Sequence, residues 1–98
     1  NYENVIKLNP NNVYALNNYA YHLACQDLDL EKAESMALKA CAAEPLNVTF
    51  ADTYAWVLFK QGKIKQAFEL LNQFVQTYEQ WSDAVKQHYE EIKQKLGK

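Results

Sequence analysis

Apolar residues recur along most of the chain with the spacing of amphipathic helices. In the segment from about 12 to 26, one stripe falls at i, i+3, i+4 and i+7: Leu16, Tyr19, Ala20 and Leu23. Similar stripes occupy about 30–43, 47–61, 63–78 and 82–96, and a shorter one begins the chain at about 2–8. The pattern therefore predicts an all-α fold in which each helix turns one apolar face toward a shared core.

Residues that favour helix ends separate these segments. Pro10 ends the first one, because proline cannot extend a helix and restricts the residue before it. Gly62 and Gly97 follow two others, and glycine tolerates the left-handed conformation found after helix C-termini. Three residues stand where side-chain oxygens can cap helix N-termini: Asp29, Asn47 and Ser82. Trp81, in the last linker, is expected to staple the final helix to the core.

The chain also repeats itself. The sequence NPNNV at 9–13 returns 35 residues later as EPLNV at 44–48, and YAYxL at 19–23 returns as YAWxL at 54–58. A fixed period in the thirties marks a stack of small units, each of which buries its apolar face against its neighbours. We therefore expect one domain over 1–98, with the end of a preceding repeat at 1–10, repeats at 11–45 and 46–80, and a further first helix or a capping helix at 81–98.

The repeat resembles the tetratricopeptide repeat, a helix-turn-helix unit of about 34 residues. Positions of its pattern in the first unit are filled by Leu16, Tyr19, Ala20, Leu23, Ala33, Ala37, Ala40 and Pro45. In the second unit they are filled by Ala51, Tyr54, Ala55, Leu58, Ala67, Leu71 and Phe74. Ala20 and Ala55 replace the usual glycine, and Glu79 replaces the closing proline. The resemblance implies a right-handed superhelix (α-solenoid) of antiparallel helix pairs that serves as a protein-interaction module.

In that family the first helix of each unit lines the inner wall of a groove, so the resemblance implies a binding surface on this wall. Its residues here are Asn17, Asn18, Tyr21, Cys25, Asp52, Thr53, Trp56, Phe59, Lys60 and His88, with Gln87, Glu91 and Lys95 extending it. Tyr21 beside Trp56 forms an aromatic strip that suits the apolar side chains of an extended peptide. Because Trp often dominates interface energies, Trp56 is expected to be the first anchor.

The same residues also admit a structural interpretation. Trp56 and Tyr21 can instead pack between adjacent helices, as aromatic residues often do in cores. Asn17 and Asn18 can simply be solvated, since exposed polar residues usually have no further role. Lys60 lies one helical turn from Trp56 and can stack on its ring. The sequence leaves both interpretations open.

Charge narrows the classes of partner. With 10 Lys+Arg against 12 Asp+Glu, the net charge is -2 and the pI about 5.6, so no basic field attracts nucleic acid. The same deficit argues against pentatricopeptide repeats, which share the 35-residue period and read single-stranded RNA. Asp52 on the wall disfavours the acidic chaperone tails that some tetratricopeptide domains bind. A protein segment of mixed or apolar character is therefore the expected partner.

The sequence patterns of known catalytic and metal-binding sites are incomplete in this chain. The only two glycines stand at helix ends, so no glycine-rich phosphate cradle exists, and neither Ser35 nor Ser82 has a His at a diagnostic spacing. His22 and Cys25 could supply two metal ligands, but no third lies in reach. We therefore expect no enzyme activity, cofactor or metal. Cys25 and Cys41 are expected to be free thiols, with Cys25 the more open to modification.

The leading functional prediction is a module that binds a peptide segment or partner domain along the groove. One alternative is a structural or self-association segment, in which terminal helices pair between two copies to form a homo-oligomer. Another is an accessory domain of a larger protein. The chain begins without Met and at a helix end, so we expect a piece of a longer protein. No stretch approaches the roughly 20 apolar residues of a membrane span, and the cysteines leave the compartment open.

Overall fold

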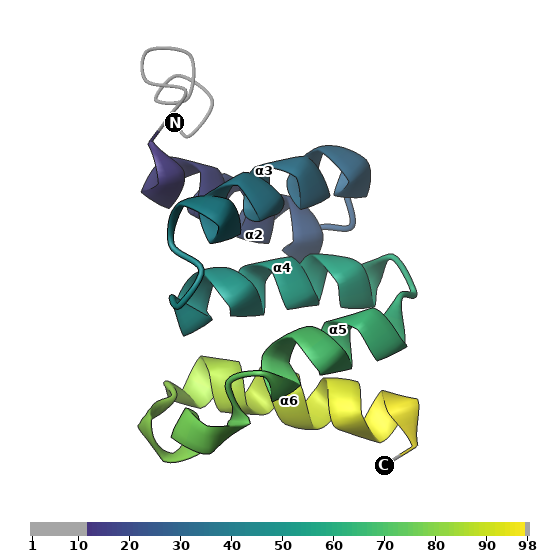
Figure 1. Cartoon of the computed structure of the whole chain (residues 1–98). Helices are drawn as coiled ribbons and strands as arrows, with labels where there is room; N and C mark the ends of the chain where they lie inside the picture. Colours follow the sequence, from purple (N-terminus) through teal and green to yellow (C-terminus); the bar gives the residue numbers. More distant parts are fainter. Residues whose placement is uncertain (1–11, 98) are drawn as a thin grey trace.

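Five α-helices and one 3-10 helix make up residues 12–97, the part of the chain that this computed structural model describes (Figure 1). They are α2 (Val13–Cys25), α3 (Leu30–Ala43), α4 (Val48–Lys60), α5 (Ile64–Asn72), the 3-10 helix η1 (Val75–Gln80) and α6 (Asp83–Leu96). The same residues contain no strand, which agrees with the predicted all-α class. The predicted end of a preceding repeat, with Tyr2, Val5, Ile6 and Pro10, lies outside the described residues.

Most helices begin and end where the sequence predicts. The Asn47 side chain accepts hydrogen bonds from Thr49 N at 2.9 Å and Phe50 N at 3.2 Å, which confirms it as the N-cap of α4. Ser82 Oγ accepts from Val85 N at 3.4 Å and caps α6. Gly62 and Gly97 adopt φ of 85° and 86°, so both end helices in the left-handed conformation as expected.

The predicted capping role of Asp29 is wrong. Asp29 precedes α3 but adopts a left-handed conformation with φ of 43°, and within residues 12–97 its side chain makes no capping bond. A capping side chain needs extended backbone dihedrals to fold back over the first amides of the helix. The tight turn after α2 prevents this, because Asp27 also has a positive φ and Leu28 N donates to Leu23 O at 3.0 Å.

The predicted continuous helix over 63–78 is also wrong. The α-helix ends at Asn72, and Thr77 inside η1 has non-helical dihedrals. Thr77 Oγ1 donates to Phe74 O at 2.9 Å and accepts from Trp81 Nε1 at 3.1 Å, and such local side-chain bonds compete with a regular helix. Trp81 is only 4% exposed and contacts Tyr78 and Tyr89, so the prediction that it staples the final helix is confirmed.

Each helix repeats the contacts of the helix one unit earlier. The first helices α2, α4 and α6 contact one another in order, α3 packs against α2 and α4, and α5 packs against α4 and α6 (Figure 1). Tyr19, Ala20 and Leu23 match their equivalents in the next unit: both Tyr are half-buried, and both Ala and both Leu are buried. The helices α2, α4 and α6 therefore form a continuous wall, which we call the inner wall.

The last helix covers the end of the stack. It buries Val85, Tyr89 and Ile92 against the rest of the core, and Ile92 is fully buried. Its opposite face exposes the polar residues Gln87 and Glu90 to solvent. The C-terminal end of the described stack is therefore closed by a helix whose outward face is hydrophilic.

Candidate partner-binding site

A cavity of about 210 Å³ opens at the point where the three helices of the inner wall meet. Its lining comes from α2, from α4 and from the start of α6: Asn17, Asn18, Tyr21, Thr49, Asp52, Thr53, Ser82, Ala84, Val85 and His88. Six of the ten wall residues predicted from the sequence lie here together: Asn17, Asn18, Tyr21, Asp52, Thr53 and His88. We refer to this space as the wall cavity.

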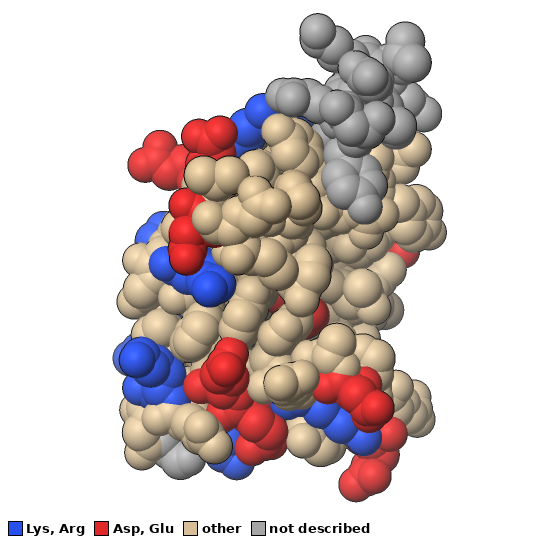
Figure 2. Space-filling view, turned by 180° about the vertical axis from the view of Figure 1, so that it is seen from behind, with Lys and Arg blue, Asp and Glu red and all other residues tan. Residues whose placement is uncertain are grey.

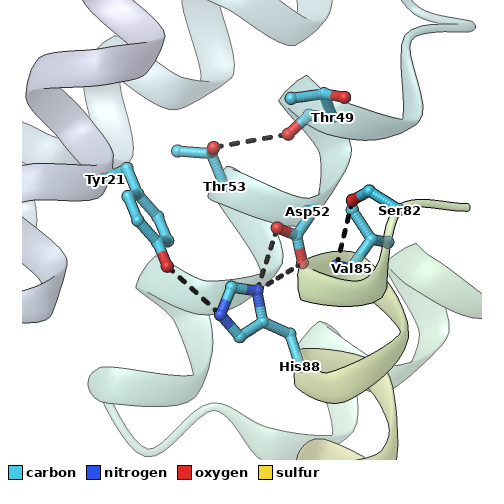
Figure 3. A network of polar contacts seen from close by, with 7 residues as sticks. All are labelled: Tyr21, Thr49, Asp52, Thr53, Ser82, Val85 and His88. Carbon is cyan, nitrogen blue, oxygen red and sulfur yellow. Dashed lines mark hydrogen bonds and ion pairs between the residues drawn. The ribbon is translucent and has the colours of Figure 1, made fainter.

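A hydrogen-bonded chain of three side chains crosses the wall cavity (Figure 3). His88 Nδ1 lies 2.9 and 3.0 Å from the two carboxylate oxygens of Asp52, and His88 Nε2 lies 3.3 Å from the Tyr21 hydroxyl. An ionised carboxylate can only accept, so Nδ1–H donates to Asp52. One neutral tautomer satisfies both contacts, because Nε2 then accepts from Tyr21. These hydrogen bonds therefore link α2, α4 and α6 through one residue of each helix.

The environment shifts the ionisation of two members of this chain. Burial raises the pKa of the Asp52 carboxyl above its ordinary value, and the hydrogen bond and charge of His88 offset only part of that rise. Asp52 is 5% exposed. The pKa of Tyr21 is raised to about 12, and burial is the largest cause. The hydrogen bond and charge of Cys25 and the charge of Asp52 contribute the rest. Tyr21 therefore keeps its proton at neutral pH and can donate it to His88.

Asn17 brings an unsatisfied acceptor to the wall cavity. Its side chain is only 7% exposed, and its Oδ1 has no hydrogen-bond partner in the described part of the chain. The interpretation of Asn17 as merely solvated is therefore wrong, whereas Asn18 beside it is exposed. An unpaired buried oxygen costs free energy, and native proteins leave few of them. The lining of the wall cavity therefore includes a buried side chain whose hydrogen bonding is incomplete within the described residues.

Trp56 does not form an exposed strip with Tyr21. Its ring is 8% exposed and lies between two others, with ring centroids 4.2 Å from His88 and 4.9 Å from Phe59. The structural interpretation of Trp56 is therefore the one observed, because the neighbouring helix α6 covers it. Lys60 Nζ lies 5.6 Å from the Trp56 ring centroid, which confirms the predicted stacking, and 3.9 Å from Asp27 Oδ2.

A second hollow continues the inner wall beyond the stacked rings. It has a volume of about 420 Å³ and is lined by Trp56, Phe59, Lys60, Glu91, Gln94 and Lys95. Three further predicted wall residues, Trp56, Phe59 and Lys60, therefore lie together here, with Glu91 and Lys95 of the predicted extension. His88 lines the first space and Trp56 the second, so their stacked rings separate the two.

The two thiols differ as expected. Cys25 is exposed, one turn after Tyr21, and lines neither space. Cys41 is half-buried on α3, and burial raises the pKa of its thiol to about 11. Because the thiolate is the reactive form, Cys41 is nearly unreactive at neutral pH.

The pairing of Asp52 with His88 was not predicted from the sequence. Both residues were expected on the wall, but their contact was not, and the aromatic strip of Tyr21 and Trp56 was expected to be central. The available signal was their separation of 36 residues, close to one repeat, which brings corresponding turns of α4 and α6 side by side. A buried acid across from a histidine is therefore the feature around which the site is built.

Charged side chains outside the site are of mixed sign. Figure 2 shows Lys beside Asp and Glu along one edge and at the end where α6 lies, without a broad field of either sign. Among residues 12–97, no three His, Cys, Asp or Glu side chains are grouped so that they could hold a metal ion. None of the described helices combines the length and apolar composition needed to cross a membrane.

Comparison with known proteins gives one informative similarity. No family model matches the chain. A TPR repeat-containing protein of Pseudomonas aeruginosa is 34% identical over 74 residues, which cover 76% of this chain. Those residues make up 12% of the Pseudomonas protein, so the chain spans only a small part of its relative. Together with the all-helical structure, the similarity suggests a fold like that of tetratricopeptide repeats.

Proposed function

We propose that the chain is a tetratricopeptide-repeat module that binds an extended peptide segment of a protein partner along its inner wall. In this proposal α2, α4 and α6 line the concave side of a right-handed superhelix, with α3 and α5 outside. The similarity to a TPR repeat-containing protein supports the assignment, as do the repeated contacts between helices. No cofactor and no catalytic step are involved.

The observation that carries the proposal is the wall cavity. It lies where three first helices meet, and its lining includes Asn17, whose buried Oδ1 has no partner in residues 12–97. A merely structural contact between these helices would be expected to be packed and fully hydrogen-bonded. A cavity whose lining includes several polar side chains suits a ligand that brings its own hydrogen-bonding groups.

The two spaces on the wall suit neighbouring side chains of one extended peptide. A polar side chain would enter the wall cavity, and a larger or apolar one would lie in the second hollow against Phe59 and the stem of Lys60. Asn18 is exposed beside the wall cavity and can both donate to and accept from a peptide backbone. Trp56 then supports the wall from beneath, and Cys25 marks its outer edge.

The self-association alternative finds less support. Pairing of terminal helices between two copies would need an apolar outward face on α6, and that face exposes polar residues such as Gln87, Glu90 and Gln94. Stable interfaces between copies are usually apolar at their centre. A role as accessory domain of a longer protein is compatible with peptide binding, since the groove would work in the same way.

Selection of a random peptide library on the immobilised chain tests the proposal. We expect linear peptides to be enriched, and the tightest of them to shift backbone amide signals of α2, α4 and α6 when titrated into nitrogen-15-labelled protein. Asn18→Arg should weaken this peptide roughly tenfold or more, because the long side chain would obstruct the wall.

The matched control is Ser35→Arg, which places the same side chain on an exposed position of α3 and should leave affinity unchanged. Shifts confined to α3 and α5, or equal affinities for the two variants, would contradict binding at the inner wall. Failure to enrich any linear peptide would count against the proposal as well.

A further inference from the structure

We infer that the wall cavity receives the cationic end of a lysine or arginine side chain carried by the partner peptide. This inference rests on the proposed function and adds the chemistry of the group that is bound. Both side chains end in a nitrogen cation that carries several N–H donors and no acceptor. The cavity offers the complementary set of groups.

Acceptors exceed donors around Asp52. Its carboxylate has about four acceptor sites, and the one donor that the described residues provide is the Nδ1–H of His88, shared between the two oxygens. Asn17 adds the buried Oδ1 that has no partner in residues 12–97. Asp52 and Asn17 both line the cavity, so a ligand with several N–H groups would meet acceptor sites of Asp52 that the described residues leave unused.

The charge of the cavity points to the same class of ligand. Asp52 is the only carboxylate among the described lining residues, and that lining includes neither lysine nor arginine. Among these lining residues His88 alone can offset the negative charge of Asp52, and it does so only when its ring is protonated. A peptide cation would therefore pair with a carboxylate that is 5% exposed, where screening by solvent is weak.

The folded protein keeps this charge at a cost. Folding raises the pKa of Asp52, so the protonated form is favoured in the folded state. The contribution of Asp52 to stability therefore falls as the pH rises from its ordinary pKa through the raised one, and at neutral pH the charge weighs against the fold. Groups retained at a cost to stability are characteristic of binding sites.

The size of the cavity limits what enters it. A volume of about 210 Å³ accommodates the end of one side chain with a few waters, each of which takes roughly 30 Å³ in the liquid. It is too small for a folded domain or for several residues of a peptide. The bound group is therefore one side-chain end, while the peptide backbone runs along the wall outside.

Titration with capped amino acids tests this inference without any selected peptide. The probes are the N-acetyl N-methylamides of arginine, lysine, citrulline and norleucine. Their binding is monitored by shifts of the backbone amide signals of nitrogen-15-labelled protein. We expect arginine or lysine, or both, to give saturable shifts around Tyr21, Thr53 and His88. Citrulline, a neutral analogue of arginine, and norleucine should bind at least tenfold more weakly, because they lack the charge.

Two variants and one control complete the test. Asp52→Asn should weaken the cationic probe roughly tenfold or more, and Asn17→Leu should also weaken it. Asn17→Leu is expected to fold, because it removes an unsatisfied buried polar group. Glu69→Gln removes one charge from an exposed position of α5 and should have no effect. Thermal melts would verify that each protein is folded.

Equal affinity for arginine and citrulline, unchanged binding in Asp52→Asn, or the absence of shifts around the cavity would each overturn the inference. Selected peptides that bind the inner wall but carry no lysine or arginine would overturn it too, and they would leave the proposed function standing. Selected peptides that bind elsewhere would refute the proposed function itself.

Discussion

Replacing Trp56 with alanine should lower the free energy of unfolding by about 3–5 kcal/mol, as is usual for a large aromatic residue removed from a core. The Trp56 ring is 8% exposed and stacks between His88 and Phe59, so its loss would leave a void between α4 and α6. Urea denaturation followed by circular dichroism would measure the change. Binding should also weaken, since His88 would lose the ring that holds it in place.

Tyr14→Ala provides the comparison. Tyr14 is 61% exposed, with an edge contact to Phe50 and a surface hydrogen bond to Glu44, so its removal should cost under about 1 kcal/mol. If Trp56 were instead the exposed anchor expected from the sequence, Trp56→Ala would abolish binding and leave folding intact. An unchanged unfolding midpoint for Trp56→Ala, together with lost binding, would restore that interpretation and contradict the packing described here.

Truncation of the chain after Trp81 should prevent stable folding. It removes α6 and with it the burial of Val85, Tyr89 and Ile92. A buried side chain of this size contributes about 1.5–3 kcal/mol, and small domains have only about 5–15 kcal/mol of total stability. The loss also exposes Trp56 and the face of α5 that α6 covers. We expect low helicity and aggregation, measured by circular dichroism and size-exclusion chromatography.

Truncation after Leu96 is the appropriate control, because it retains all of α6 and should behave like the full chain. A cooperative thermal transition near that of the full chain after removal of α6 would contradict the role assigned to this helix. It would mean that α2 to α5 form a self-sufficient core and that the wall cavity is a secondary feature.

Helix positions could be predicted from the sequence because local signals dominate them. Asn47, Ser82 and Gly62 act at the helix ends through their own hydrogen bonds or dihedral angles, and these depend little on distant residues. The two errors had tertiary or turn-specific causes. Asp29 is fixed by a tight turn with two positive φ angles, and the break after Asn72 depends on bonds that involve Thr77 and Trp81.

The candidate site was predictable in location but not in character. The 35-residue repeat placed Asn17, Asp52 and Trp56 on one wall, since corresponding helices of stacked units face the same way. Which of them is buried depends on how closely α6 approaches α4, and that distance is set by the whole core. The close approach of α6 to α4 both buries Trp56 and pairs Asp52 with His88. No local sequence pattern encodes this approach.

A crystal structure of the chain with its tightest selected peptide would show whether α2, α4 and α6 form one peptide-binding wall with Asp52 at its centre. We expect an extended peptide along these three helices, with a side-chain nitrogen about 2.7–2.9 Å from a carboxylate oxygen of Asp52. A peptide bound across α3 and α5, or one that leaves the wall cavity empty of any basic group, would contradict it.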